Sequence, residues 1–341
     1  MSKDAPLRIL HINDVAHVAS NLIKGLTLLG DKAELFNPIV NVSHSKKYSS
    51  AGILIRRIRD SRRISRIIKN RNIDIVHVHY AYMAPLVWPS GREYFLHCHG
   101  SDITKSLYNR KFRWITRKSI SKARVVFYST PNLKSHLVKL RPDPIFIPNP
   151  VDTDFFFPSH DESTNNGSIT VFIASRLSLE KGVDIAIEGV RIARRKADFD
   201  TVAFDHGIDG GILLDAIKEK IPDIHLQPET DASGILALIN RSDIVLAQLR
   251  TGILSVTEQE AMSAGKPVIT RFDYADFYDS PPPVLQARNP EEVAEQILRF
   301  VADSEERRRL GEKARQWVIE NHDYRTVGKM VRSFYEKTFE K

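Results

Sequence analysis

The sequence has almost no cysteine and no long hydrophobic run. Cys98 is the single cysteine among 341 residues, which excludes an intramolecular disulfide and a cysteine-cluster zinc or iron–sulfur site. No stretch approaches the ~18 uncharged apolar residues that a membrane-spanning helix needs. The N-terminus also lacks the apolar core of a signal peptide. We therefore expect a cytoplasmic protein.

Three common functional motifs are missing as well. The sequence contains no Gly-x-Gly-x-x-Gly after a strand, no Walker-type Gly-Lys-Ser/Thr loop and no His-Glu-x-x-His helix. These absences disfavour a simple dehydrogenase, a P-loop ATPase and a zinc protease. With 42% apolar and 27% charged residues, the composition is typical of globular proteins and disfavours disorder or a fibrous repeat.

Charge is divided unevenly along the chain. Residues 1–150 hold 26 Lys and Arg against 9 Asp and Glu, a net charge of +17, whereas residues 151–341 hold 24 against 33, a net charge of −9. This asymmetry indicates two domains. The basic half is expected to face an anionic partner such as phospholipid headgroups, a phosphorylated acceptor or nucleic acid.

Short β-rich apolar runs alternate with helical stretches in both halves of the chain. The nearly continuous hydrophobicity of these runs predicts strands that are buried on both faces of a parallel sheet. The predicted strands are 8–12, 74–79, 93–98 and 124–128 in the first half, and 169–173, 201–204, 223–226, 243–247 and 267–270 in the second. Predicted helices of the second half lie near 181–196, 211–220, 232–241 and 256–264. The pattern is that of two doubly wound, Rossmann-like α/β domains.

The domain boundary is expected near Ile147-Pro-Asn-Pro150, where two prolines interrupt the pattern. We predict an N-terminal domain over 1–150, a second domain over 151–322, and a C-terminal helical segment, 323–341, that returns to the first domain. Residues 159–168 are polar and are predicted to form a loop. Asn289 followed by Pro290 is a helix start signal.

The stretch Ala174–Gly182 leads from a predicted buried strand into a helix and contains Arg176 and Lys181. Two cations at the carboxyl edge of a parallel sheet, beside a helix N-terminus, favour binding of a diphosphate. The spacing alone is equally compatible with a solvated basic loop.

A second candidate stretch is Gln248–Gly265. Gly252 permits close approach of a ligand to the backbone, and Ser255 is expected to cap a helix that begins near Val256 and ends at Gly265. A phosphate can bind at that helix start. Glu258 and Glu260 point to different sides of the helix, so we expect at most one to face a ligand and the other to be solvated.

These stretches together resemble the family 4 retaining glycosyltransferases, which have the GT-B fold of two Rossmann-like domains facing a cleft. The likeness extends to Pro148–Asp152, to Glu260–Val268 and to the turn His99-Gly-Ser-Asp102. The resemblance implies that Arg176 and Lys181 bind the donor diphosphate and that Glu260 binds the nucleotide ribose. It also implies a set of further residues that line the donor site: Gly252, Ile253, Val256 and Thr257.

Two departures from the family pattern concern the donor sugar and the acceptor. Gly252 stands where the family usually has a second Glu that holds sugar hydroxyls, as in a subgroup with a Gln-Leu-x-x-Gly stretch. Asn13 and Asp14 replace the usual Gly-Gly of the first loop, and both residue types tolerate left-handed backbone. We expect Asn13, Asp14 and Asp102 to lie on the acceptor side, where Asp14 would suit a polyol hydroxyl.

Two His-x-His pairs, His77 with His79 and His97 with His99, end neighbouring predicted strands. Each pair lies on one strand face, so a metal site is conceivable. However, no carboxylate or cysteine completes a known ligand spacing, and we expect no metal. The resemblance assigns His99 to contact with the sugar and the reacting phosphate.

The segment 53–69 is predicted to be a helix with a stripe of isoleucines, Ile55, Ile58, Ile64 and Ile68, that packs on the sheet. Its cations are Lys69 and six arginines: Arg56, Arg57, Arg59, Arg62, Arg63 and Arg66. They indicate a docking surface for an anionic membrane, so the protein is expected in the cytoplasm, with possible peripheral association on the inner face of the membrane. RNA fits the charge too, but no RNA-binding motif accompanies it.

The resemblance implies a metal-independent retaining glycosyltransferase without a cofactor. It would move a sugar from a UDP- or GDP-type donor to a glycan, lipid-linked or polyol acceptor. Alternatives are a nucleotide-sugar epimerase of the same fold, a non-catalytic glycosyltransferase-like subunit and a nucleic-acid-binding module. The base, sugar, acceptor, linkage and oligomeric state stay open at this point.

Overall fold

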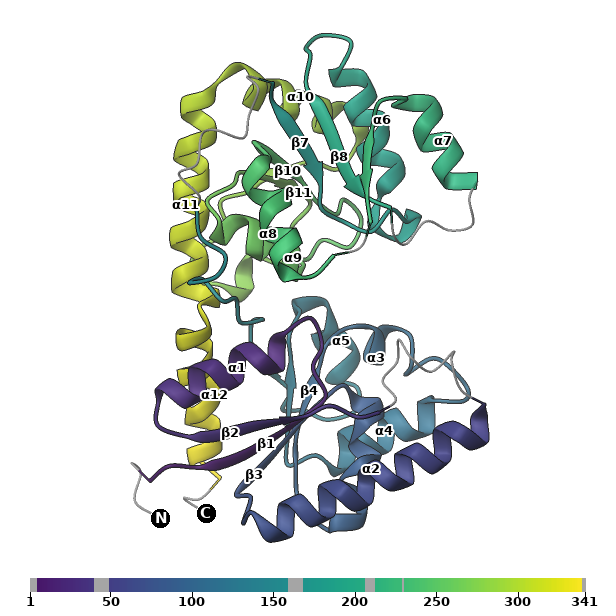
Figure 1. The fold of residues 1–341 in the computed structure, drawn as a ribbon, viewed down its shortest axis with the longest axis vertical. Coiled ribbons are helices and arrows are strands. Elements are labelled where there is room, and N and C mark those ends of the chain that lie inside the picture. Colours follow the sequence, from purple (N-terminus) through teal and green to yellow (C-terminus); the bar gives the residue numbers. More distant parts are fainter. Residues whose placement is uncertain (1–4, 40–48, 159–167, 206–211, 229, 339–341) are drawn as a thin grey trace. The chain divides into compact units, whose positions relative to one another are not determined.

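The computed structural model describes residues 5–39, 49–158, 168–205, 212–228 and 230–338, and the predicted loop 159–168 lies almost entirely outside them. The chain divides into two compact units. Unit 1 comprises 1–150 together with 324–341, and unit 2 comprises 151–323. Each unit is an α/β fold built on a six-stranded parallel sheet (Figure 1).

The sheet of unit 1 has the order β2-β1-β3-β4-β5-β6. Its strands are β1 (Arg8–Ile12), β2 (Lys32–Phe36), β3 (Ile75–His79), β4 (Phe95–Cys98), β5 (Val125–Tyr128) and β6 (Ile145–Phe146). Its helices are α1 (Val18–Leu28), α2 (Ser50–Asn70), α3 (Ser101–Thr104), α4 (Arg113–Lys122), α5 (Lys134–Leu137) and α12 (Tyr324–Glu336), with the short 3-10 helices η2 (Ala81–Leu86), η3 (Trp88–Ser90) and η4 (Pro131–Leu133). The chain order reverses between β1 and β3. Ligands of open α/β sheets bind at such a switch point, beyond the carboxyl ends of the strands.

Helix α12 belongs to unit 1 because it packs against α1 (Figure 1). The two helices approach closely at Gly25, where a Cβ atom would lie 2.2 Å from the Tyr324 carbonyl oxygen. Val331 and Tyr335 of α12 are fully buried in the core over the sheet. The final helix of the chain therefore completes the core of the N-terminal unit.

The sheet of unit 2 has the order β12-β11-β10-β7-β8-β9, with its switch point between β7 and β10. Its strands are β7 (Thr170–Ile173), β8 (Asp200–Phe204), β9 (His225–Gln227), β10 (Ile244–Leu246), β11 (Val268–Thr270) and β12 (Leu285–Gln286). Its helices are α6 (Val183–Ala193), α7 (Ile212–Lys220), α8 (Ala232–Arg241), α9 (Val256–Ser263), α10 (Pro290–Ala302) and α11 (Ser304–His322), with the 3-10 helices η6 (Leu179–Lys181) and η7 (Ala275–Phe277).

The doubly wound α/β class is confirmed for both units. All nine predicted strands exist, but the edge strands β2, β6 and β12 were not predicted. β6 and β12 have two residues each, and β2 has only one buried residue, Phe36. Strands this short or this polar carry no hydrophobic run that a pattern can detect.

The predicted isoleucine stripe of α2 is wrong at its first two positions. Ile64 and Ile68 are buried, whereas Ile55 and Ile58 are 66% and 45% exposed. Ile55 precedes Ile64 by nine residues, about two and a half helical turns, and therefore lies on the opposite side of the helix. The inward face instead carries Ser61, whose hydroxyl donates to the Leu86 carbonyl at 2.9 Å.

Candidate active site

The loop after β7 carries Arg176 and Lys181 to the carboxyl edge of the unit 2 sheet, beside the switch point. Arg176 is exposed, and its guanidinium group has no hydrogen-bond or ion-pair partner within the described residues, while its carbonyl accepts from the Ser178 amide at 2.8 Å. Lys181 ends the 3-10 helix η6 and its Nζ donates to Gln248 Oε1 at 2.7 Å. Its carbonyl accepts from the Leu249 amide at 2.9 Å. The loop is thus fastened to the chain that leaves the neighbouring strand, β10.

Helix α9 begins at the same edge of the sheet, as predicted from Ser255 and Gly265. Ser255 is the N-cap, and a capping box links it reciprocally to Glu258. Gly265 has a φ of 73°, and the amides of Gly265 and Lys266 donate to the carbonyls of Met262 and Ala261, each at 3.0 Å. This is a Schellman C-terminus. Both predicted ends of the helix are confirmed.

The expectation that one of the two glutamates of α9 is solvated is wrong. Glu258 is 1% exposed and Glu260 is 7% exposed. Glu258 accepts from the Ser255 amide, from Thr270 Oγ1 at 2.6 Å and from Gln248 Nε2 at 3.3 Å. Burial raises its pKa, and the hydrogen bonds from Thr270 and Ser255 and the charge of Lys181 oppose that rise. The capping box directs the Glu258 side chain toward the protein interior, where it accepts structural hydrogen bonds.

Glu260 has no hydrogen-bond donor among the described residues. Burial alone raises the pKa of its carboxyl group to about 7. A nearly buried carboxylate without a donor is unfavourable in the unliganded protein. Hydroxyl groups of a ligand would satisfy it.

Gln248 links the loops that follow three neighbouring strands. Its Oε1 accepts from Lys181, and its Nε2 donates to the Ile253 carbonyl at 2.7 Å. Its backbone carbonyl oxygen lies 2.8 Å from Thr270 Oγ1, whose one proton it shares with Glu258. Gln248 is 1% exposed. It therefore holds the lysine, the residue after Gly252 and the end of β11 in one fixed arrangement.

Gly252 is required by backbone conformation and by space. Its φ is 66°, and a Cβ atom would lie 2.3 Å from Asp273 Oδ2. The Asp273 amide also donates to the Gly252 carbonyl at 2.9 Å. The position therefore has no room for the glutamate that the resembling family usually has. Ile253, Val256 and Thr257 are partly exposed, and the last two begin α9.

In unit 1 the His99-Gly100 turn is organised by Asp102. Asp102 Oδ1 accepts from the amides of His99 and Gly100 at 3.1 and 3.0 Å, and Oδ2 accepts from the Ala81 amide at 3.0 Å. Asp102 is fully buried, and burial raises its pKa to about 6. We expected Asp102 to lie on the side of the sugar acceptor. Its carboxylate instead faces backbone amides and not solvent, so Asp102 positions the His99-Gly100 turn.

Asn13 and Asp14 follow β1 at the switch point of unit 1. Asn13 has a φ of 70°, which confirms the expected left-handed conformation, and its Nδ2 donates to the His79 carbonyl at 3.2 Å. Asp14 accepts from the Ala19 amide at 2.9 Å and from the Ser20 hydroxyl. Its carboxylate thus holds the first turn of α1 while it stays partly exposed.

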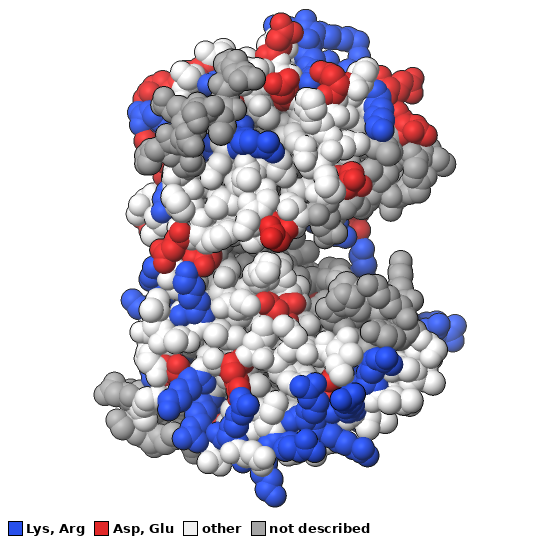
Figure 2. All heavy atoms as spheres, in the orientation of Figure 1, with Lys and Arg blue, Asp and Glu red and all other residues white. Residues whose placement is uncertain are grey.

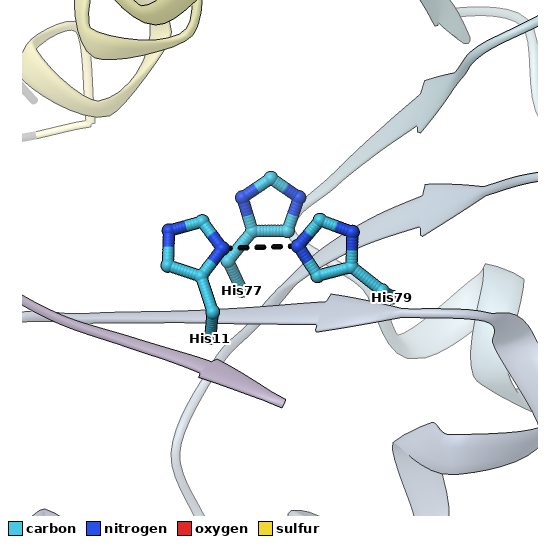
Figure 3. A group of neighbouring side chains, drawn as sticks. All are labelled: His11, His77 and His79. Atoms are coloured by element: carbon cyan, nitrogen blue, oxygen red, sulfur yellow. Dashed lines mark hydrogen bonds between the residues drawn. The ribbon is translucent and has the colours of Figure 1, made fainter. Parts of the chain in front are cut away.

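Five histidine rings share the sheet face that α1 and α12 cover. They are His11, His77, His79, His97 and His99, and neighbouring rings are stacked with centroid distances of 4.5 to 5.4 Å. Figure 3 shows three of them, and His77 Nδ1 is also hydrogen bonded to the Tyr335 hydroxyl of α12. Burial lowers the pKa of all five, to about 3 for His11 and His99. The cluster is therefore neutral at pH 7.

Two family models match the chain. A model described as Glycosyltransferase Family 4 matches residues 17–155, and one described as Glycosyl transferase-like matches residues 202–331. Residues 17–155 therefore match a glycosyltransferase family 4 domain and residues 202–331 match a glycosyl transferase-like domain, and the two α/β units have the GT-B fold. The matches cover most of unit 1 and most of unit 2, so both halves of the predicted fold are accounted for.

Relatives and solved structures agree with this assignment. An uncharacterised glycosyltransferase of Methanocaldococcus jannaschii is 23% identical over 301 residues, 84% of this chain and 82% of that protein. The fold is similar to sucrose-phosphate synthase from Thermosynechococcus elongatus, with a TM-score of 0.74, 13% identity and coverage of 98% and 99% of the two chains. It is also similar to HepE from Anabaena in complex with UDP and glucose, with a TM-score of 0.73, 13% identity and coverage of 97% and 100%. These structures share the GT-B fold.

Two residues that shape the site, Gln248 and Asp273, were not predicted from the sequence. The role of Gln248 was missed although its stretch was noted, because only the fold brings it to Lys181, 67 positions away. Asp273 carries no motif, and it lies next to Gly252 because β10 and β11 are adjacent in the sheet.

Proposed function

We propose that this protein transfers a sugar from a nucleoside-diphosphate sugar to a glycan, lipid-linked or polyol acceptor, with retention of anomeric configuration and without a metal. The observation that carries the proposal is the carboxyl edge of the unit 2 sheet. One switch point lies beside three groups: the exposed Arg176, the start of α9, and Lys181, which is hydrogen bonded to Gln248. Glu260, buried and without a donor among the described residues, stands on the same helix.

The charges at this site suit the two polar parts of a nucleoside diphosphate: cations for the diphosphate and a carboxylate for the ribose. Arg176 and Lys181 would bind the diphosphate, assisted by the amides and dipole at the start of α9. Glu260 would accept hydrogen bonds from the ribose hydroxyls. The structural neighbours HepE and the catalytic domain of starch synthase IV from Arabidopsis thaliana are described as complexes with UDP and with ADP.

The chemical demand of the reaction is the negative charge that develops on the departing diphosphate. Fixed cations and backbone amides stabilise such charge without a reorganisation cost. Lys181 meets this condition because Gln248 holds its ammonium group at 2.7 Å. His99, at the turn organised by Asp102, would contact the sugar and the reacting phosphate.

A thermal-shift screen with UDP, GDP, ADP and CMP tests the donor site. A ligand at a hundredfold excess over its Kd stabilises the folded state by about 2.7 kcal/mol. We expect one of the nucleoside diphosphates to raise the Tm of the wild type and to leave the Tm of Arg176→Ala unchanged. A matched control is Arg195→Ala, an exposed arginine at the end of the α6 region. No shift with any nucleotide would favour a non-catalytic subunit, and donor isomerisation without acceptor would favour an epimerase.

We also propose that the exposed arginine-bearing face of α2 docks on an anionic membrane surface, where a lipid-linked acceptor would be found. Leu54 and Ile55 are 61% and 66% exposed, and the exposed arginines of the same helix are Arg59, Arg62, Arg63 and Arg66. A groove beside the helix is lined by Leu54, Ile58, Arg62, Arg66, Pro85 and Leu86, among others. Lys and Arg gather over unit 1 on the face shown in Figure 2. Within the described residues no helix is long and apolar enough to cross a membrane.

Sedimentation with vesicles tests this surface. Each Lys or Arg near an anionic bilayer contributes about 1 kcal/mol, so Arg59→Glu, Arg62→Glu and Arg66→Glu together should weaken binding to phosphatidylglycerol vesicles at least about 100-fold. Control changes are Arg195→Glu, Lys196→Glu and Lys313→Glu, exposed residues of unit 2. Equal binding of both triple variants, or equal binding to neutral vesicles, would refute the docking surface.

A further inference from the structure

Three histidines from three neighbouring strands form a hydrogen-bonded chain in unit 1. His11 lies on β1, His79 ends β3, and His99 follows β4. His11 Nδ1 is 2.9 Å from His79 Nε2, and His79 Nδ1 is 3.1 Å from His99 Nε2. Figure 3 shows the nitrogens of His11 and His79 turned toward each other. The chain runs from the buried sheet to the His99-Gly100 turn.

This connectivity permits only two arrangements of protons on neutral rings. A neutral imidazole has one N–H donor and one nitrogen lone pair. If His11 donates from Nδ1, His79 accepts at Nε2 and must carry its own proton on Nδ1, which it donates to His99 Nε2. His99 then carries its proton on Nδ1 as well. In the reverse arrangement all three protons are on Nε2.

The two ends of the chain decide between these arrangements. His11 Nε2 is buried and has no partner in the described part of the chain. A proton there would be an orphaned buried N–H, which is rarer and costlier than an unused lone pair. At the other end His99 is partly exposed, and the described residues offer no partner for its Nδ1. The arrangement with all protons on Nδ1 therefore places the free donor where a ligand can reach it.

We propose that His11 and His79 are positioning residues that hold His99 in its neutral Nδ1–H form, so that His99 donates a hydrogen bond to an oxygen of the sugar donor. His99 cannot act as a base in this state, because its Nε2 lone pair is already engaged by His79. The identity of the substrate oxygen rests on the proposed transferase function. The proton arrangement depends only on unit 1.

A metal ion is the competing use of these rings. The ligand nitrogens of His11, His77 and His79 lie within 4.8 Å of one another, as do those of His79, His97 and His99. A metal requires lone pairs that converge on one point about 2.0–2.1 Å from each nitrogen. The facing nitrogens of His11 and His79 are 2.9 Å apart. This is a hydrogen-bond distance, so the two nitrogens share a proton. Metal binding would have to open this bond.

His97 provides a matched control within the same cluster. Its ring stacks on His99 with a centroid distance of 4.6 Å and lies 5.4 Å from His79. Neither of its ring nitrogens has a partner among the described residues. His97→Phe therefore keeps a stacked ring without removing a bond of the chain, whereas His79→Phe removes both bonds.

Long-range 1H–15N NMR of protein labelled at its 12 histidines reads the tautomers directly. We expect the Nδ1–H pattern for His11, His79 and His99 at pH 7. We expect that His99 keeps it in His97→Phe and loses it in His79→Phe, with the folded state of each variant checked by near-UV circular dichroism. An Nε2–H pattern for His99 in the wild type, or no change in His79→Phe, overturns the proposal. A stoichiometric metal in the purified protein, whose removal by chelator changes the ring signals, also overturns it.

Steady-state kinetics provide the second measurement. We expect His79→Phe to lower kcat about 10- to 100-fold with little change in KM, and His97→Phe to stay within about twofold of the wild type. Equal kcat in His79→Phe and wild type overturns the positioning role. Absence of transfer in the wild type, together with the expected NMR pattern, would instead contradict the proposed function while supporting the proton arrangement.

Discussion

Glu258 and Glu260 lie two residues apart on α9 and are both buried, yet only Glu258 has hydrogen-bond donors within the described residues. Successive positions of a helix point in different directions, so the cap and Thr270 serve one glutamate and leave the other without a partner. The Glu258 carboxylate therefore stabilises the site, whereas the Glu260 carboxylate is available to accept hydrogen bonds from a ligand. Substitution of the two glutamates should therefore change the stability of unit 2 in opposite directions.

Glu260→Gln should stabilise the unliganded protein at alkaline pH. The folded pKa of Glu260 is about 7 against an ordinary 4.5, so the folded state binds more protons between these values. Stability from this group is present below pH 4.5 and is lost as pH rises through 7. At pH 8 the ionised carboxylate costs on the order of 3 kcal/mol. Urea unfolding of unit 2 should show that gain at pH 8 and little difference at pH 4.5, with loss of the nucleotide-induced Tm shift.

Glu258→Gln should have the opposite effect. The amide retains one oxygen but cannot accept from Ser255, Thr270 and Gln248 together. We expect a loss of about 1–3 kcal/mol at pH 7 in the same unfolding measurement. If the two variants change stability in the same direction at pH 8, the distinction between the glutamates is wrong.

Lys181→Met should lower kcat/KM about 100- to 1000-fold, the usual effect of removing one group that stabilises developing charge. Initial rates with the donor identified by thermal shift measure this. Lys220→Met is the control, since Lys220 pairs with Glu188 at 3.2 Å on the surface of unit 2. Wild-type rates in Lys181→Met would remove the lysine from the diphosphate site.

Gly252→Ala should destabilise unit 2 more than Gly91→Ala destabilises unit 1. Both glycines have nearly the same φ, 66° and 67°, but a Cβ atom meets Asp273 at 2.3 Å in the first case and no atom within 4 Å in the second. We expect about 1 kcal/mol for the backbone conformation alone. Contact with Asp273 should add about 1–3 kcal/mol. Chemical unfolding gives both values, and equal losses would show that the contact relaxes freely.

Acid should destabilise unit 1 through its buried histidines. Their folded pKa values lie below the ordinary 6.5, so the unfolded chain binds more protons and stability, complete above pH 6.5, falls as pH falls. The raised pKa of Asp102 opposes part of this loss. His97→Phe removes one of these groups and should gain about 2 kcal/mol relative to wild type between pH 7 and pH 5. Parallel pH profiles of the two proteins would contradict this account.

Local features of the site followed from the sequence because they depend on neighbouring residues. The N-cap at Ser255 and the left-handed Gly265 end the helix where the sequence indicates. The left-handed Asn13 was likewise expected from its residue type. Glu258 was misread, because helix position alone does not reveal which neighbouring strand supplies donors.

By itself the sequence determined the two α/β sheets, the ends of α9 and the charged groups at the carboxyl edge of unit 2, since hydrophobic runs and capping signals act over a few residues. Only the tertiary structure decided which groups meet. Gln248 reaches Lys181 across 67 positions and His79 reaches His11 across 68, because parallel strands distant in the chain are adjacent in the sheet. The contacts that hold the lysine and orient the histidine therefore arise from strand order, which no local pattern encodes.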